Sequence, residues 1–239
     1  MERQSSIIAI GRKGIDTMKK IDVGKKILSE NEKYALENAL LLTERKKLCL
    51  NMISSPGSGK TTILTRTINE LRSGIKMGVI EGDIETDIDA ERIRATEAPV
   101  VQINTEGACH LSAVQVNSAL KALPVEDLDL IFIENVGNLV CPSAFELGET
   151  AKIVVLSVPE GDDKPAKYPA IFAKSKVLLI NKIDLLQTGG QVDFDIERVK
   201  ADASKLNKRI EIFPVSGKTG EGMGSWYDWL DRSVKSLRF

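Results

Sequence analysis

The sequence predicts a protein of the α/β class, in which a mostly parallel β-sheet is flanked by helices. Apolar runs of strand length alternate with segments of helical character, at residues 48–53, 77–80, 100–103, 130–133, 153–158, 177–180 and 210–215. Because these runs are continuous, they indicate strands that are buried on both faces, as in a parallel sheet covered by helices. In such sheets ligands bind at the carboxyl ends of the strands. The polar residues discussed below follow several of these runs.

Helical segments are predicted at both ends of the chain. Residues 31–47 place Ala35, Ala39 and Leu42 on one face, and two interpretations remain open, a helix packed on the rest of the chain or a dimerisation arm. A terminal helix is expected to cover the core with Trp226, Tyr227, Trp229 and Leu230. A length of 239 residues with 42% hydrophobic content is sufficient for one sizeable core. We therefore expect an N-terminal helical extension over residues 1–46 and one domain over residues 47–239.

Composition excludes several classes of partner. The 33 Lys and Arg residues balance 34 Asp and Glu residues, which leaves no electrostatic footprint for nucleic acid or for an anionic membrane. No apolar run approaches the ~20 residues of a membrane span, and no stretch is typical of a signal peptide, so we expect a cytoplasmic protein. An odd number of cysteines, three, argues against a disulfide framework.

A phosphate-binding loop follows the first apolar run. Residues 54–62 read S-S-P-G-S-G-K-T-T, and backbone N–H groups in such a loop surround a β-phosphate at the start of a helix. The lysine would span the β- and γ-phosphate oxygens, and the threonine after it would offer a hydroxyl to Mg²⁺. Ser54 stands where the general pattern has glycine, at the exit of the strand. An ordinary turn between strand and helix is the alternative. The nucleotide-binding residues expected here are Gly57, Ser58, Gly59, Lys60, Thr61 and Thr62.

A second motif selects the base. The tetrapeptide N-K-I-D at residues 181–184 follows an apolar run, and Asp184 can accept hydrogen bonds from N1–H and the 2-amino group of guanine, which adenine lacks. Such a site can reject adenine by roughly 10⁴-fold. Asn181 belongs to the same motif, and Lys182 would cover the base. The S-G-K sequence of Ser216, Gly217 and Lys218 resembles the last guanine-side loop of GTPases. Together these motifs favour GTP and predict a P-loop GTPase fold.

Two acidic residues complete the predicted reaction centre. Asp83 ends the predicted strand M-G-V-I-E-G-D, and Glu134 ends L-I-F-I-E, in an E-N-V-G sequence that resembles the D-x-x-G loop of GTPases with Glu in place of Asp. Each can hold Mg²⁺ directly or through water, and Asp83 can also orient the attacking water. With Lys60, these carboxylates are the predicted catalytic residues, because phosphoryl transfer depends mainly on positioning and charge neutralisation. For either acid alone, a capping or turn role remains open.

A metal site is the other candidate. Cys109 and His110 are adjacent, His110 is the only histidine, and Cys141 follows Glu134 by seven residues. Two thiolates and an imidazole suit tetrahedral Zn²⁺ or square-planar Ni²⁺. A fourth ligand would come from water or from a second subunit, and a two-fold interface could pool both sets. The alternative is that both cysteines are buried apolar residues and that His110 is a hydrogen-bonded surface group. Cys49 lies in the first apolar run and is expected to be inert core.

Four segments closely resemble the HypB family of hydrogenase nickel-incorporation GTPases, and the resemblance covers about residues 48–216. They are E-G-D-I-E-T-D-I-D-A-E-R at 81–92, T-E-G-A-C-H-L at 105–111, I-E-N-V-G-N-L-V-C-P at 133–142 and S-V-P-E-G-D-D-K-P at 157–165. The resemblance implies that Cys109, His110 and Cys141 bind Ni²⁺ or Zn²⁺. It also implies that nucleotide state controls homodimerisation and metal transfer to a hydrogenase large-subunit precursor, with a companion nickel maturation factor.

The chain departs from some members of that family. It has no cysteine before Cys49, so the N-terminal cysteine motif of some members is absent, and a single histidine leaves no nickel-storing tract. Other clients remain open, namely urease or cobalamin-dependent mutases. The urease chaperones typically carry Cys-Pro-His, whereas Cys109 here abuts His110, which favours the hydrogenase client. A passive metal-binding protein with a vestigial nucleotide site is a further alternative.

Overall fold

The fold is described from a computed structural model that covers residues 23–82, 87–105, 107–187 and 192–238. Its centre is a seven-stranded sheet in which every pair of neighbouring strands is parallel, in the order β3-β2-β4-β1-β5-β6-β7. The strands are β1 (Leu48–Ser54), β2 (Met77–Glu81), β3 (Val100–Gln102), β4 (Leu130–Glu134), β5 (Ala151–Ser157), β6 (Val177–Asn181) and β7 (Glu211–Pro214). All seven predicted strands are confirmed, with ends that differ by one or two residues.

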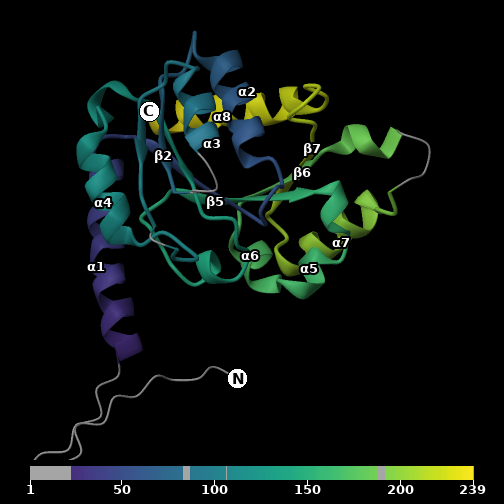
Figure 1. Cartoon of the computed structure of the whole chain (residues 1–239), viewed down its shortest axis with the longest axis horizontal. Helices are drawn as coiled ribbons and strands as arrows, with labels where there is room; N and C mark the ends of the chain where they lie inside the picture. The colour runs from purple at the N-terminus through teal and green to yellow at the C-terminus, as the bar shows by residue number, and fades with distance from the viewer. Residues whose placement is uncertain (1–22, 83–86, 106, 188–191, 239) are drawn as a thin grey trace, which may run out of the picture.

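Helices cover both faces of this sheet (Figure 1). On one face lie α2 (Lys60–Leu71), α3 (Asp87–Arg94) and α8 (Met223–Arg238). On the other lie α1 (Val23–Glu44), α4 (Ala113–Ala122), α6 (Pro169–Lys174) and α7 (Ile196–Leu206), with the short α5 (Lys164–Lys167) beside them. The predicted α/β architecture with helices on both faces is therefore confirmed. Among the residues that the structure describes, no helix is both long enough and apolar enough to cross a bilayer.

The two faces of the sheet differ in their packing. The first buries a continuous apolar cluster in which Met52 and Phe132 from the strands meet α2 and Trp226 of α8. The predicted C-terminal helix does cover the core, with Trp226, Trp229 and Leu230 buried and Tyr227 partly so. The second face holds two separate apolar clusters, one under α1 and α4 and one under α6 and α7. Buried polar side chains, Asn51 of β1 and its register partner Lys152 of β5, lie in the same face.

Helix α1 packs on α4 of its own chain (Figure 1). The predicted face is correct for Ala35 and Leu42, which are buried, whereas Ala39 is only partly buried. Two asparagines share that face and were not anticipated. Asn38 donates to the carbonyls of Ala113 and Leu147 at 3.0 and 2.8 Å, and Asn31 accepts from the Ala113 N–H at 2.8 Å. These bonds attach α1 to the first turn of α4 and to the segment that precedes β5.

The carboxyl ends of the central strands meet at one edge of the sheet. Strand β1 lies between β4 and β5, and in the register of the sheet Met52 pairs with Glu134 while Ser157 pairs with Asn181. The loop after β1, the end of β4 and the end of β6 therefore open onto the same edge. This arrangement gathers most of the predicted nucleotide-site residues.

Candidate functional site

The loop after β1 has the backbone geometry of a phosphate cradle. Gly57 and Gly59 adopt φ angles of 71° and 92°, which residues with a side chain rarely adopt. A Cβ on Gly59 would lie 2.5 Å from Nδ2 of Asn181, so a larger residue would also collide with the base-reading motif. Helix α2 begins at Lys60 directly after these glycines. The helix N-terminus and the free N–H groups around it are suited to an anion.

Ser54 contacts the lysine of this loop. The ammonium of Lys60 lies 3.0 Å from the Ser54 hydroxyl, and both side chains are buried. The residue that replaces the usual glycine therefore interacts with the phosphate-binding lysine, which motif comparison did not show. The hydroxyl of Ser58 is also buried, and it has no hydrogen-bond partner within the described part of the chain.

The first turn of α2 is joined to the end of β4. The hydroxyl of Thr61 donates to Oε1 of Glu134 at 2.7 Å, and Glu134 is buried. Thr62 follows on the exposed side of α2. Asp83, the other predicted acid, lies outside the described residues. The structure thus brings Thr61 and Glu134 together, as expected of two groups that share a cation.

The N-K-I-D motif contacts the phosphate-binding loop and the S-G-K segment. Asn181 donates to the Ser58 carbonyl at 2.8 Å and accepts from the Gly217 N–H at 2.9 Å. Lys182 donates from its ammonium to the Gly57 carbonyl at 2.7 Å. These bonds hold together three segments that lie far apart in the sequence.

The carboxylate expected to read the base is oriented by a serine. Oδ1 of Asp184 accepts a 2.6 Å hydrogen bond from the Ser216 hydroxyl, and Ser216 in turn accepts from the Thr219 N–H at 3.0 Å. One carboxylate oxygen is therefore held in place while the group as a whole remains partly exposed. Lys218, next along the segment, is exposed.

Arg66 of α2 is a contact residue that the motifs did not indicate. Its guanidinium donates to the carbonyls of Gly217 and Lys218 at 2.7 and 2.6 Å. The planar guanidinium fixes two successive carbonyls at once, and so it attaches the S-G-K segment to the helix that follows the phosphate-binding loop. An arginine inside an amphipathic helix offers no sequence signal for this role.

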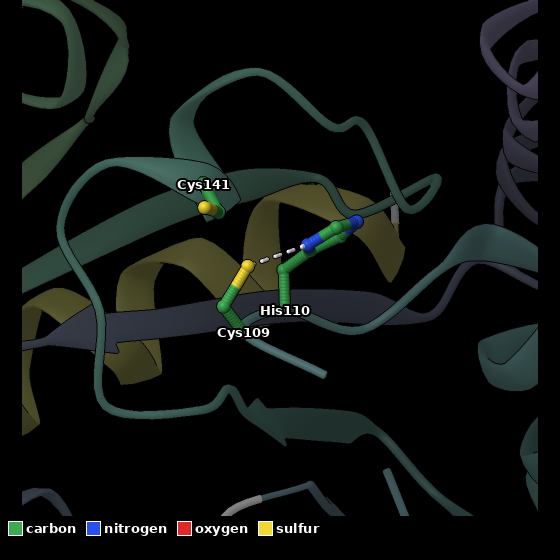
Figure 2. A group of neighbouring side chains, drawn as sticks. All are labelled: Cys109, His110 and Cys141. Carbon is green, nitrogen blue, oxygen red and sulfur yellow. Dashed lines mark hydrogen bonds between the residues drawn. The ribbon is translucent and has the colours of Figure 1, made fainter. Parts of the chain in front are cut away.

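The three predicted metal ligands converge at one place. One candidate ligand atom from each of Cys109, His110 and Cys141 lies within 4.8 Å of the others, the one such group of three among the described residues. Figure 2 shows the sulfur of Cys109 between the His110 ring and the sulfur of Cys141. The Cys109 sulfur is 3.5 Å from Nδ1 of His110. Cys109 is exposed and the other two are partly buried, so the cluster is open to solvent on one side.

The thiol of Cys109 and the imidazole of His110 differ in protonation. A hydrogen bond with the Cys141 thiol, assisted by burial, raises the pKa of Cys109, while burial lowers the pKa of His110. A neutral imidazole is ready to coordinate, whereas Cys109 must lose a proton to the medium when a cation binds. Two sulfurs and one nitrogen are a donor set for Zn²⁺ or Ni²⁺, and the described residues add no fourth ligand to this group of three.

Two neighbouring side chains contact the predicted metal ligands. Asn138 donates to the Cys109 carbonyl at 3.3 Å and accepts from the Cys141 N–H at 3.4 Å, so one amide contacts the backbone of both cysteines. Phe145 stacks on the His110 ring, with centroids 3.9 Å apart and planes inclined at 24°. Neither residue was predicted. Asn138 lies within the segment between Glu134 and Cys141, which is the only signal that the sequence offers.

Cys49 does not belong to this cluster. It is fully buried in β1 beneath α1 and α4, and burial, with a contribution from Glu149, raises its pKa far above the usual range. Its expected role as inert core is consistent with these surroundings.

Comparisons with known proteins identify the family of this chain. Residues 49–214 match the family model described as CobW/HypB/UreG, nucleotide-binding domain. The hydrogenase maturation factor HypB of Escherichia coli (strain K12) is 47% identical over 218 residues, which cover 91% of this chain and 74% of that protein. Two crystal structures are similar. HypB from Archaeoglobus fulgidus has a TM-score of 0.80 at 39% identity, covering 87% of this chain and all of that one. HypB from Helicobacter pylori in complex with nickel has a TM-score of 0.79 at 37% identity, covering 87% and 96%.

Proposed function

Because the chain belongs to the CobW/HypB/UreG family of nucleotide-binding domains, with hydrogenase maturation factors among its relatives, we propose that it is a GTP-hydrolysing metallochaperone. It binds nickel at Cys109, His110 and Cys141 and assists nickel insertion into the precursor of a [NiFe]-hydrogenase. The observation that carries this proposal is the convergence of three soft and borderline ligand atoms, within 4.8 Å of one another, on the domain that holds the phosphate-binding loop.

Contacts among three loops support the proposed nucleotide-binding site. Asn181 and Lys182 hold the phosphate-binding loop, and Ser216 holds Asp184. A guanine between these elements would donate its N1–H and 2-amino group to Asp184. Phosphate oxygens would accept from the N–H groups near Gly59 and from the Ser58 hydroxyl, which is buried without a partner among the described residues.

Mg²⁺ fits the donors beside the phosphate-binding loop. The hydroxyl of Thr61 and the carboxylate of Glu134, 2.7 Å apart, are hard oxygen donors of the kind that Mg²⁺ prefers. We assign them, with Asp83, to this cation, whose contribution is to neutralise charge on the β- and γ-phosphates. Lys60 carries the remaining positive charge toward the phosphates, and Ser54 orients its ammonium.

The proposed metal site is completed by a ligand from a second subunit. Three ligands with an exposed side leave a coordination position that a two-fold partner could supply. We therefore propose a homodimer that forms when metal and GTP are bound, with Zn²⁺ as a competing occupant. The proposed partners are the hydrogenase large-subunit precursor and a companion nickel maturation factor. Residues 47–239 form the GTPase domain in this proposal. The predicted N-terminal extension, residues 1–46, contains α1 (Val23–Glu44), and its residues 1–22 lie outside the described part of the chain.

The proposal is tested by the mass of the protein under native conditions. Nickel and a non-hydrolysable GTP analogue, added together, are expected to give a dimer that carries both ligands, whereas either ligand alone gives less dimer. A chain that takes up the analogue but no nickel would contradict the metallochaperone. In a separate assay of phosphate release from GTP, nickel binding without any turnover would instead favour a passive metal-binding protein.

A further inference from the structure

Leu111, the residue after His110, is fixed between the ends of two strands. It is fully buried, and its backbone N–H donates to Oδ1 of Asn135 at 3.2 Å. Asn135 directly follows Glu134, the acid that contacts Thr61. One hydrogen bond thus joins the residue after a proposed metal ligand to the residue after a proposed Mg²⁺ ligand.

The side chain of Leu111 reaches the end of β2. A Cβ added to Gly82 would lie 2.5 Å from a Leu111 methyl carbon, so the leucine packs directly on the Gly82 backbone. Gly82 donates its N–H to the Glu134 carbonyl at 2.9 Å and precedes Asp83 in the sequence. Leu111 therefore contacts the residue before Asp83 and the residue after Glu134.

Asn135 is held firmly by its other bonds. Its Oδ1 also accepts from the Val136 N–H at 2.9 Å, and its Nδ2 donates to Oδ1 of Asn51 at 3.1 Å. Asn51 donates to Glu149 at 2.9 Å, so the amide ends a buried polar chain that starts beneath the sheet. Asn135 therefore joins the N–H of Leu111 to this buried polar chain.

We propose that Asn135 is a positioning residue that couples nucleotide state to nickel affinity through the N–H of Leu111. This inference rests on the proposed function. A change at the γ-phosphate that moves Glu134 also moves Asn135, because the two residues are consecutive. Asn135 then shifts Leu111 and, through the backbone, His110. Asn138 has a different role, because it contacts the cysteine backbones and not the strand ends.

The two asparagines predict different outcomes when nickel is titrated into the full chain with GDP or with a GTP analogue. In the wild type, the nickel Kd is expected to differ between the two forms by a factor in the typical range of about 5- to 150-fold. Asn135→Ala should bring this ratio to within about twofold of unity. Asn138→Ala should weaken nickel binding by a similar factor in both forms and leave the ratio as in the wild type. Asn117→Ala removes a buried amide of α4 that bonds to Asn38 and controls for loss of stability.

Asn135→Asp keeps an oxygen that can accept a hydrogen bond from the Leu111 N–H. This variant replaces Asn135→Ala in the titration if the alanine variant does not fold. Asn135→Asp is expected to retain most of the difference in nickel Kd between the GDP and GTP-analogue forms. Loss of that difference in this variant would overturn the assignment of the coupling to the Leu111 hydrogen bond. A wild-type ratio that persists in Asn135→Ala would overturn the coupling role of Asn135 alone. If the nickel Kd of the wild type is the same with GDP and with the GTP analogue, both the coupling role of Asn135 and the proposed GTP control of nickel binding are overturned. If no form binds nickel, the proposed function itself is contradicted.

Discussion

The hydroxyl of Thr61 donates to Oε1 of Glu134 at 2.7 Å, which joins the first turn of α2 to the end of β4. This contact places a hydroxyl and a carboxylate beside the phosphate-binding loop. We expect Glu134→Gln, which keeps the acceptor oxygen but removes the charge, to raise the Mg²⁺ concentration needed for half-maximal GTP turnover by about tenfold or more. Glu221→Gln, an exposed substitution, is the control. An unchanged Mg²⁺ requirement would contradict the assignment of Glu134.

Lys60 is expected to be essential for turnover. Its ammonium lies at the start of α2 against Ser54, where it would neutralise the β- and γ-phosphate oxygens. No arginine finger is recognised in the sequence, so by analogy with unassisted GTPases the wild type should turn over slowly, on the order of 10⁻³ s⁻¹. Lys60→Ala should abolish phosphate release. Turnover near ~10 s⁻¹ without any partner, a rate typical of assisted GTPases, would show that a catalytic group has been missed.

Asp184 is expected to determine base preference. Since Ser216 holds one of its oxygens, the carboxylate is oriented to accept from guanine. Asp184→Asn should weaken GTP binding by about 1.5–3 kcal/mol, the usual contribution of a charged hydrogen bond, and shift preference toward xanthosine triphosphate, whose 2-oxo oxygen accepts from an amide. Competition with GTP, xanthosine triphosphate and ATP measures this shift, and substitution of an exposed residue of α8, Asp228→Asn, is the control. Wild-type protein that binds ATP as tightly as GTP would disprove the role.

The buried Glu149–Lys152 pair is expected to stabilise the fold at neutral pH. The carboxylate and ammonium lie 2.6 Å apart. Burial raises the pKa of Glu149, but Lys152 and the hydrogen bond from Asn51 outweigh it, and the pKa lies below its usual range. A lowered folded-state pKa gives stability that is present above the unfolded pKa, about 4.3, and is lost as pH falls through the folded value.

Glu149→Gln should therefore lower the free energy of unfolding by about 3 kcal/mol near neutral pH, measured by urea titration, with a smaller difference from the wild type below pH ~4. The exposed Lys200–Glu197 pair provides the comparison, because Glu197→Gln should cost less than about 1 kcal/mol. A difference between Glu149→Gln and the wild type that stays constant with pH would rule out the ion pair as its source.

The strands were predictable because burial on both faces leaves continuous apolar runs, which survive in the sequence without any tertiary information. The extent and the buried face of helix α1 were less predictable. Its buried face includes Asn31 and Asn38, whose partners at Ala113 and Leu147 lie far along the chain, and the helix begins at Val23 rather than at residue 31. A polar residue on a packed face has no periodic signature when its partner is distant.

In the candidate site too, local sequence patterns predicted some residues, whereas contacts between distant segments could not be predicted. Short motifs carry the residues that bind phosphate and guanine, because those contacts come from consecutive residues. The residue types made Cys109, His110 and Cys141 candidate ligands, and the resemblance to a family strengthened that prediction, but their approach depends on the loops after β3 and β4. Asn135, Asn138 and Arg66 act through backbone atoms of other loops, and nothing in their spacing predicts those contacts.

The most direct test of the proposed metallochaperone is a nickel titration of the wild type, Cys141→Ala and Cys49→Ala. Nickel binding is monitored by the thiolate-to-nickel charge-transfer absorption band. Cys141 belongs to the three-residue cluster, whereas Cys49 is buried in the core away from it. The account predicts that Cys141→Ala weakens nickel binding by about 100-fold or more, abolishes nickel-induced dimerisation and still binds GTP, while Cys49→Ala binds nickel as the wild type does. Equal nickel affinity in Cys141→Ala and the wild type would contradict the metal site.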